Sequence, residues 1–396
     1  MKLFKNNQLS RRQFIGQSTR LGALGLTSLP FLGCGNSQER EKAVMEASTP
    51  SPLSILILGG TSFLGPHQIA YAMGRGHSIT TFTRGRTEPT IYKDLFSKVT
   101  SLTGDRADDL SALQNGSWDV VIDNSGHNVE WARSSARLLK DKCDLYLFTS
   151  STGVYYPYLD DNIDESKEVL LVEPEGIEDE DMKIEYWYGV MKANSEIAIR
   201  EEFGEDRTLA IRPTYMIGPA DNSNRFIHWP VRLSRGGEVL VPGKPEDPVQ
   251  YADVRDVAEF MIRMAEQKMN GTYNAVGPEK AQGILDFVRE AHGAFDNEAT
   301  FTTIEDYDFL KEEGILHIVP WIMPEGNNYG SARINNAKGI AAGLTFRPLT
   351  ETVRDTYDWW YSDALTQEQR DEFEKNPESV LVREDEILDR WKKYQS

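Results

Sequence analysis

The amino-acid sequence predicts an α/β fold, in which a doubly wound parallel sheet is followed by a smaller C-terminal α/β lobe. Short apolar segments alternate with helical patterns between residues 54 and 148, and such alternation is typical of a parallel sheet covered by helices on both faces. The first apolar segment ends at two glycines, which indicates a strand, a tight turn and a helix. Because the chain has only two cysteines, its stability must come from a buried core.

The first 34 residues are predicted to be a targeting signal and not part of the fold. Arg11 and Arg12 follow Ser10, and Phe14 and a weakly apolar stretch come after them. This order is typical of a twin-arginine export signal. The apolar stretch is too short and too rich in glycine for a membrane-spanning helix. We therefore expect export by the twin-arginine machinery and a periplasmic location.

The end of this signal resembles a lipoprotein processing site. The residues are Phe31-Leu32-Gly33-Cys34, although leucine is usual where Phe31 stands. Acylation of Cys34 would anchor the protein to a membrane, whereas cleavage nearby would leave a soluble periplasmic protein. Residues 35–52 are polar and contain proline and serine, as expected of a linker.

The charge balance is acidic and argues against nucleic acid as a partner. The whole chain carries −19, and the five charged residues before Cys34 are all basic, so the remainder is five units more negative, at −24. Such a surface repels phosphate backbones. The acidic segment 160–181 lacks a turn glycine at calcium-loop spacing and is predicted to be a solvated loop. The six histidines form no cluster with metal-ligand spacing, so no metal is expected.

Five strands are expected in the first half of the folded part. Apolar segments place them at residues 54–58, 78–82, 99–102, 118–122 and 145–148. One helix is expected over residues 63–74. Further helices are expected between the third and fourth strands and between the fourth and fifth.

The turn after the first strand carries a glycine pattern that fits a dinucleotide. Gly59 permits a tight turn, Gly65 permits close packing of helix on strand, and backbone N–H groups at the helix start can receive a pyrophosphate. Ser62 stands where a middle glycine is common, and a helix-capping turn without a ligand would use the same residues. We predict a Rossmann-type NAD(P)-binding domain over residues 53–219. Its cofactor loop comprises Gly59, Thr61, Ser62, Phe63, Leu64 and Gly65.

Residues after the later strands would complete the cofactor site. Where an acidic residue would hold a ribose diol, the sequence has Arg84, which could accept a 2′-phosphate or be a surface cation. The cofactor is expected to be NAD, and Arg84 makes NADP possible. Asp105, after the third strand, could contact the adenine, and Asn124, after the fourth, could line the cofactor floor.

A tyrosine and a lysine four residues apart indicate redox chemistry on an alcohol or ketone. On a helix, Tyr188 and Lys192 share one face. A nearby cation favours the phenolate and so lowers the tyrosine pKa from about 10, which lets the side chain act as a base. Isolated pairs of this kind are common, so the other motifs decide what the pair means.

The ordered set of motifs resembles the extended short-chain dehydrogenase/reductase superfamily, and in particular its NAD-dependent epimerase/dehydratase family, from about residue 53 to residue 360. Besides the glycine loop and Tyr188-x-x-x-Lys192, four segments occur in the family's order. They are FTSSTGVY at 148–155, RPTYMIGP at 212–219, VQYADVRDVA at 249–258 and GTYN at 271–274.

The resemblance implies a catalytic role for three residues. Ser151, with Ser150 as the second choice, would hydrogen-bond the substrate oxygen. Tyr188 would exchange its proton, and Lys192 would hold the nicotinamide ribose and lower the pKa of Tyr188. Hydride would move to or from the nicotinamide ring.

One departure from the family narrows the reaction. Sugar-nucleotide dehydratases carry an Asp-Glu pair directly after the catalytic serine or threonine, and here those positions are Thr152 and Gly153. Dehydration by that route is not expected. Epimerisation through a transient ketone and net dehydrogenation or reduction both stay open.

The second lobe, residues 220–396 with the C-terminal helices, is expected to bind the substrate. Arg225, His228 and Trp229 offer a cation and rings for a sugar or an anion, although packing between the lobes would use the same residue types. The junction between the lobes is expected to involve Tyr251, Asp253 and Asp256.

Export and nicotinamide chemistry together favour a cofactor that does not leave. Free dinucleotides and nucleotide-activated sugars are cytoplasmic, whereas twin-arginine export carries folded proteins with their cofactors in place. We therefore expect an epimerase-like enzyme that acts on a carbohydrate hydroxyl of a small-molecule or oligosaccharide substrate. A net NAD(P)-dependent dehydrogenase or reductase is the second interpretation, and a non-catalytic nucleotide- or RNA-binding protein is the third. A homodimer stays open.

Overall fold

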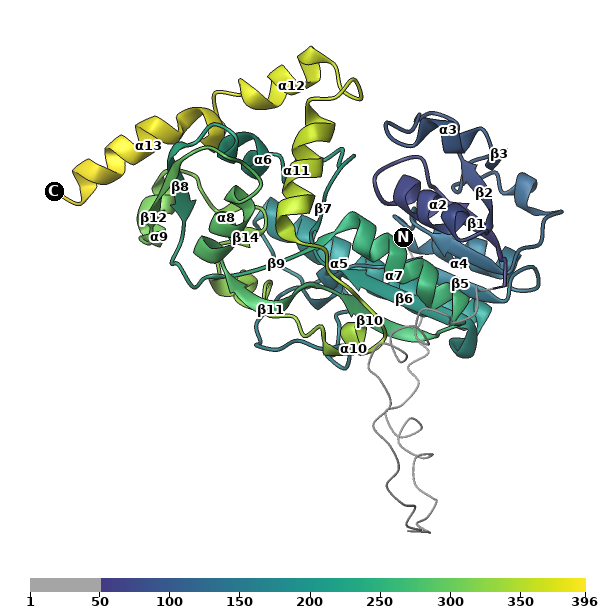
Figure 1. The fold of residues 1–396 in the computed structure, drawn as a ribbon. Helices are drawn as coiled ribbons and strands as arrows, with labels where there is room; N and C mark the ends of the chain where they lie inside the picture. Colours follow the sequence, from purple (N-terminus) through teal and green to yellow (C-terminus); the bar gives the residue numbers. More distant parts are fainter. Residues whose placement is uncertain (1–50) are drawn as a thin grey trace, which may run out of the picture. The chain divides into compact units, whose positions relative to one another are not determined.

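A parallel sheet of seven strands forms the centre of the first lobe (Figure 1). The computed structural model describes residues 51–396, so the predicted signal, Cys34 and nearly all of the predicted linker lie outside the described residues. The strand order is β10-β6-β5-β4-β1-β2-β3, and every neighbouring pair is parallel. The bounds are Ser54–Leu58 (β1), Ser78–Thr83 (β2), Thr100–Thr103 (β3), Val120–Asp123 (β4), Leu145–Thr149 (β5), Thr208–Pro213 (β6) and Gly271–Ala275 (β10).

Helices cover both faces of this sheet, which explains why its central strands β1, β4 and β5 are buried along nearly their whole length. Ile55 and Ile57 of β1 pack in one apolar cluster with α2 and α7. Leu56 and Leu58, which point to the other face, pack in a second cluster with α4 and α5. The predicted fold class is therefore confirmed. The helices are α2 (Leu64–Gly74), α4 (Val129–Leu139), α5 (Glu180–Phe203) and α7 (Val254–Glu266).

The prediction of a helix between the third and fourth strands is wrong. The segment forms only a short 3₁₀ turn at Ser111–Leu113. Asp105 and Asp109 accept hydrogen bonds from backbone N–H groups two residues ahead of them, at 3.0 and 3.1 Å. Such local bonds favour turns over a helix. A one-turn helix, α3 (Lys93–Phe96), lies between the second and third strands.

The second lobe has small sheets, β11-β9-β7 and β12-β8, and a separate core. Trp229, Phe287 and Trp321 are fully buried in that core, and helices α11 and α13, yellow in Figure 1, pack against it. The strands are β7 (Met216–Ile217), β8 (Gly237–Pro242), β9 (Pro248–Asp253), β11 (Gly277–Gly283), β12 (Ala299–Ile304), β13 (His317–Ile318) and β14 (Trp321–Ile322). The helices are α6 (His228–Leu233), α8 (Ile284–His292), α9 (Tyr307–Glu312), α10 (Ala337–Ala341), α11 (Leu349–Trp360), α12 (Gln367–Glu374) and α13 (Val380–Tyr394).

The chain passes between the lobes more than once. After β7, β8 and β9 in the second lobe, α7 and β10 return to the first lobe, where β10 is the edge strand of the large sheet. A single cut at residue 219 therefore does not separate the two lobes, because α7 packs on the large sheet and β10 is one of its strands.

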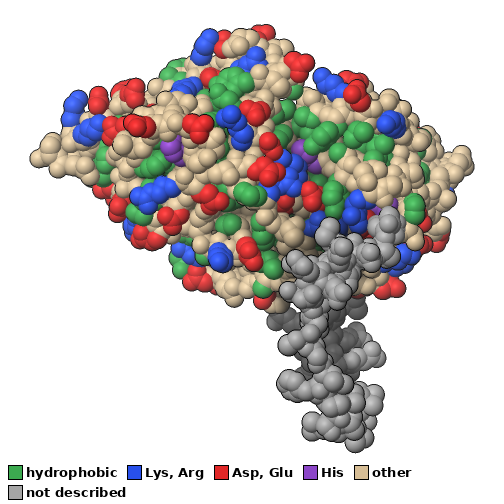
Figure 2. All heavy atoms as spheres, viewed as in Figure 1, with side chains coloured by type: hydrophobic (Ala, Val, Ile, Leu, Met, Phe, Trp, Pro, Cys, Tyr) green, Lys and Arg blue, Asp and Glu red, His purple; other side chains and the backbone are tan. Residues whose placement is uncertain are grey.

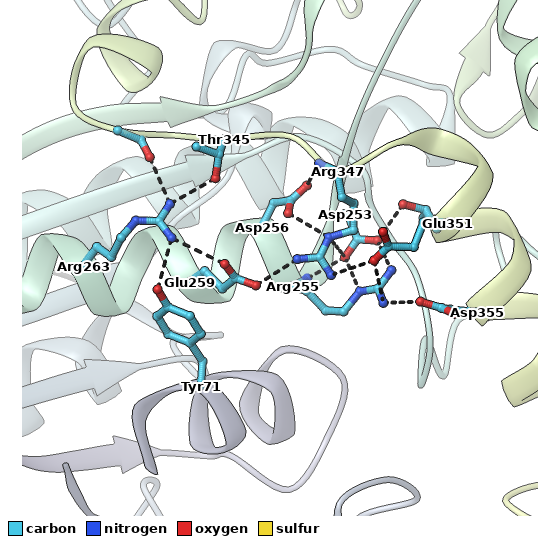
Figure 3. A network of polar contacts seen from close by, with 12 residues as sticks. Tyr71, Asp253, Arg255, Asp256, Glu259, Arg263, Thr345, Arg347, Glu351 and Asp355 are labelled. Atoms are coloured by element: carbon cyan, nitrogen blue, oxygen red, sulfur yellow. Dashed lines mark hydrogen bonds and ion pairs between the residues drawn. The ribbon is translucent and has the colours of Figure 1, made fainter. Parts of the chain in front are cut away.

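A network of charged side chains joins the lobes at the start of α7 (Figure 3). Asp253 accepts hydrogen bonds from the backbone N–H of Arg255 at 2.8 Å and from the Thr352 hydroxyl at 2.7 Å. Arg347 donates to Asp256 through its backbone N–H and its Nε, at 3.0 and 2.8 Å. Asp253 and Asp256 thus lie at the junction as predicted. Tyr251 instead packs in the core of the second lobe.

Candidate active site

The loop between β1 and α2 has the backbone shape that a pyrophosphate requires. Gly59 has φ +95°, and a Cβ on Gly65 would lie 2.2 Å from the Cα of Gly60, so only glycine fits. Phe63, at the N-cap position, makes no side-chain hydrogen bond to α2, and the first turn of α2 carries no acidic residue. Oriented N–H groups without a competing carboxylate suit an anion. The loop residues therefore fit a dinucleotide.

The other residues predicted for the cofactor differ in their positions. Asn124 lies beside the glycine loop, where its Oδ1 accepts from the Thr149 hydroxyl at 2.8 Å and its Nδ2 donates to Gln68 at 2.7 Å. Arg84 is exposed at the end of β2. The Asp105 carboxylate accepts from the N–H of Ala107 within its own turn. Of the three, Asn124 is the one that the structure places next to the loop.

Ser151 and Tyr188 line one cavity of about 240 Å³, which we call the inner cavity. Ser151 follows β5, and its Oγ accepts the backbone N–H of Gly153 at 3.0 Å. A Cβ at residue 153 would lie 2.9 Å from the Tyr188 ring, and a Cβ at residue 189 would lie 2.4 Å from the carbonyl oxygen of Gly153. Glycine at both positions lets α5 approach the turn after β5, and this approach brings Tyr188 beside Ser151. We did not predict this role for the two glycines, although both stand within the motifs.

Lys192 lies behind Tyr188, one turn along α5. Its side chain is buried, Nζ donates to the carbonyl oxygen of Thr149 at 3.0 Å, and Nζ is 5.8 Å from the centre of the Tyr188 ring. Burial lowers the pKa of Lys192 to about 8, against the opposing effect of the carboxylates of Asp123 and Glu196. The ammonium therefore stays mostly charged at neutral pH.

The pKa of Tyr188 differs from our expectation. We expected Lys192 to lower it, but burial of the phenol raises it above the usual value of 10. A hydrogen bond with Ser151 and the nearby charge of Arg225 act in the lowering direction, and Glu185 acts against them. Arg225 is thus the cation that most favours the phenolate in this structure.

Ser150 belongs to a scaffold and not to the inner cavity. Its hydroxyl donates to Glu196 at 2.6 Å, and Glu196 pairs with Arg212 through two bonds of 2.9 and 2.8 Å. Arg212 also donates to the hydroxyl of Tyr155 at 2.9 Å, and that hydroxyl donates to Asn274 at 2.8 Å. The motifs at 148–155, 212–219 and 271–274 therefore meet in one buried polar network. Ser150 as the second choice for the substrate oxygen is wrong, because its hydroxyl is committed to Glu196.

The three residues of the second lobe that were predicted to contact the substrate also differ in their positions. Trp229 is fully buried, and its Nε1 donates to the carbonyl oxygen of Val319 at 3.0 Å. The predicted substrate contact at Trp229 is therefore wrong, because the ring fills the core of the second lobe. Arg225 and His228 do line a large opening of about 800 Å³, which we call the outer cleft. The inner cavity and the outer cleft share wall residues, including Tyr158, Tyr215 and Arg225.

Between residues 51 and 396, no helix is both long and apolar enough to cross a membrane. No cluster of His, Cys, Asp and Glu side chains in the same range could hold a metal ion.

Several solved structures share this fold. One is a putative epimerase from Burkholderia cenocepacia J2315, with a TM-score of 0.56, 17% identity, and coverage of 78% of this chain and 98% of that one. A second is a UDP-N-acetylglucosamine 4-epimerase from Methanobrevibacter ruminantium M1, in complex with UDP-N-acetylmuramic acid. Its TM-score is 0.56 and its identity is 16%, and the match covers 78% of this chain and 98% of that one. A third is WbmH from Bordetella bronchiseptica, in complex with NAD⁺. Its TM-score is 0.55 and its identity is 14%, and the match covers 80% of this chain and 100% of that one. At these identities the likeness shows the fold.

Sequence comparison gives the family. The chain is similar to the chloroplast stem-loop binding protein of 41 kDa b from Arabidopsis thaliana, with 26% identity over 334 residues, which cover 80% of this chain and 82% of that protein. The model of the NAD dependent epimerase/dehydratase family matches residues 55–276, from β1 to just beyond β10. That match spans more than half of the chain and confirms the family and the NAD cofactor class that the motifs predict. The chain belongs to the NAD dependent epimerase/dehydratase family.

Proposed function

We propose that the protein is an epimerase-like enzyme that oxidises a carbohydrate hydroxyl to a transient ketone and reduces it again. The observation that carries this proposal is the pairing of Ser151 and Tyr188 on one cavity, with Lys192 buried behind them. A dinucleotide held at the glycine loop would supply the hydride acceptor and donor.

Each polar group of the inner cavity can act at a defined point of the proposed reaction. Because the Ser151 Oγ accepts the N–H of Gly153, its hydroxyl hydrogen can be donated either to the Tyr188 oxygen or to a substrate oxygen. Tyr188 would take the substrate's hydroxyl proton during oxidation and return it during reduction. Its raised pKa makes it a proton donor at neutral pH, and the charge of Arg225 stabilises the phenolate that forms when the proton leaves.

The walls of the inner cavity argue against dehydration by the family's acid–base pair. Thr152 is buried, and its hydroxyl donates to the carbonyl oxygen of Pro213 at 3.4 Å. Gly153 has no room for a carboxylate side chain, because its Cβ would lie only 2.9 Å from the Tyr188 ring. Neither position supplies the acid or the base that eliminating water requires, which favours epimerisation or net redox chemistry.

Contacts between the lobes support a cofactor that stays bound. Asn222 donates to the hydroxyl of Ser62 in the cofactor loop at 2.8 Å, and His67 of α2 contacts the carbonyl oxygen of Pro219 at 3.1 Å. The segment after β7 is thus tied to the loop that would hold the pyrophosphate and to the first turn of α2. We propose NAD as the resident cofactor, and exposed Arg84 leaves NADP open.

Export remains part of the proposal and rests on the sequence motif alone. Twin-arginine export would deliver the folded, loaded enzyme to the periplasm, with or without a lipid on Cys34. Cell fractionation tests this, because Cys34→Ser should move an anchored protein from the membrane to the soluble fraction. Unchanged fractionation of the variant would remove the lipid anchor.

RNA binding is a second candidate, favoured by the name of the Arabidopsis relative. The net charge of −19 opposes it, and Figure 2 shows acidic side chains interspersed with basic ones over the visible face. We expect no mobility shift of a stem-loop RNA in near-physiological salt. A saturable shift with the purified protein would favour the binding function instead.

The direct test of the cofactor is to denature the purified protein and identify the nucleotide released. We expect close to one NAD per chain. Adding a substrate should then change the reduced-nicotinamide absorption only transiently if the enzyme is an epimerase. A lasting change would indicate net oxidation or reduction, which is the alternative activity, and release of no dinucleotide would contradict the proposal.

A further inference from the structure

The outer cleft extends the reaction site into a space large enough for more than the reacting group. It holds about 800 Å³, which is within the range of about 300–1,000 Å³ typical of ligand pockets. Tyr158, Glu185 and Tyr215 line both the outer cleft and the inner cavity. A substrate whose reacting carbon lies at Ser151 and Tyr188 would therefore continue into the outer cleft.

The charges along this path do not suit a diphosphate. Arg225 is the one Lys or Arg side chain among the described residues that lines either opening, and its Nε lies 3.5 Å from a carboxylate oxygen of Asp221. Asp181 and Glu185, both exposed, add two carboxylates to the cleft wall. A nucleoside diphosphate would thus meet more negative than positive charge.

The N-terminus of α13 does not reverse this balance. Ser379 and Val380 place it at the wall of the outer cleft. A helix N-terminus is equivalent to roughly half a positive charge, whereas a diphosphate carries about two negative charges. The helix N-terminus and Arg225, whose charge is shared with Asp221, are together too weakly positive to neutralise a diphosphate.

The remaining walls suit hydroxyl groups and sugar rings. Tyr156, Tyr158, Tyr215 and Phe373 supply aromatic surface, on which the C–H face of a sugar can pack. The side chain of His228 is 7% exposed, and its Nε2 has no hydrogen-bond partner within the described residues. Burial lowers the pKa of His228 to about 3, so the imidazole is neutral and matches a hydroxyl and not an anion.

We propose that the outer cleft binds an uncharged oligosaccharide, and not a nucleotide-activated sugar, with the reacting residue of the chain at Ser151 and Tyr188. This inference rests on the proposed function for the position of the reacting carbon. It separates the protein from those fold neighbours that are described with nucleotide sugars.

The test measures binding to the purified holoprotein by calorimetry at pH 8, where exposed histidines are uncharged. The probes are UDP, UDP-glucose and a panel of neutral di- to hexasaccharides. We expect at least one neutral oligosaccharide to bind and UDP to neither bind nor displace it. Tighter binding of UDP or UDP-glucose than of every oligosaccharide would overturn the inference, and so would binding of neither class.

Two variants locate the binding. Phe373→Ala should weaken oligosaccharide binding roughly tenfold, because Phe373 is part of the aromatic wall of the outer cleft. Tyr394→Ala removes an aromatic side chain that is 57% exposed and lines neither opening, so it serves as the matched control. Equal effects of the Phe373 and Tyr394 variants would overturn the placement.

The outcome also separates this inference from the proposed function. Reduction of the bound dinucleotide by a UDP-sugar would uphold the enzyme and overturn the neutral substrate. Oligosaccharide binding without any change of the dinucleotide, across the whole panel, would uphold the cleft and contradict the epimerase.

Discussion

Two glycines fix the position of the tyrosine on which the proposed chemistry depends. Gly153 lies under the Tyr188 ring, and Gly189 lies against the carbonyl oxygen of Gly153. The distance between α5 and the turn after β5 is therefore set by the absence of two side chains. A side chain at either position would move the phenol away from Ser151.

Gly153→Ala tests this placement. The new Cβ would lie 2.9 Å from the Tyr188 ring, and a displacement of about 1 Å at a reacting group costs on the order of 100-fold in kcat. We expect that loss with an unchanged circular dichroism spectrum. Gly74→Ala, where a Cβ would meet nothing within 4 Å, is the control. Equal kcat values for the two variants would contradict the placement.

Alanine substitutions of the two neighbouring serines are expected to have different effects on kcat and on the free energy of unfolding. Ser151→Ala should lower kcat with little change in the free energy of unfolding. Ser150→Ala removes a buried bond to Glu196 and should destabilise by about 1–3 kcal/mol, with the smaller effect on kcat. Denaturant melts and steady-state rates on both variants measure this, and the reverse pattern would assign the substrate oxygen to Ser150.

The segment after β7 links the lobes over the cofactor loop. It contacts α2 through His67 and the loop through Ser62, and the network of Asp253, Asp256 and Arg347 joins the lobes at the start of α7. These contacts come from elements far apart in the sequence. They explain how the lobes can hold a ligand between them without a disulfide.

Asn222→Ala is expected to speed release of the cofactor. The variant loses the bond to the Ser62 hydroxyl, which is worth about 0.5–1.5 kcal/mol, or roughly a twofold to tenfold change in the release rate. Dialysis of the loaded protein, followed by measurement of the retained nucleotide, tests this. A release rate equal to that of the wild type would show that the contact does not retain the cofactor.

His67, which contacts the carbonyl oxygen of Pro219, makes the stability of the junction sensitive to acid. Burial lowers its pKa to about 4 from the reference value of 6.5, so the unfolded chain binds the proton first as the pH falls. The stability that this group contributes is complete above pH 6.5 and is lost between about pH 6.5 and 4, with a slope of up to about 1.4 kcal/mol per pH unit. In denaturant melts at several pH values, the free energy of unfolding of His67→Gln should decline less steeply with falling pH than that of the wild type. A parallel decline in the variant would place the pH dependence elsewhere.

For the molecule as a whole, the sequence predicted the parts that depend on local patterns. The β1 turn with Gly59 and Gly65, and the pairing of Tyr188 with Lys192 on one helix, follow from short-range spacing. The burial of Trp229 and the commitment of Ser150 to Glu196 depend on partners up to 90 residues away. No local pattern distinguishes a ring that faces a cleft from one that fills a core. The return of α7 and β10 to the first lobe was likewise missed, because β10 pairs with β6 across a segment that includes β7, β8 and β9 of the second lobe.

Rapid mixing of Tyr188→Phe with substrate tests the central claim most directly. The variant keeps the ring on Gly153 and loses only the hydroxyl, so it should retain the bound dinucleotide. We expect the transient reduced-nicotinamide absorption of the wild type to form about 100- to 10,000-fold more slowly in the variant, as for loss of a general acid–base group. Formation of that absorption at the wild-type rate in the loaded variant would contradict a catalytic role for Tyr188.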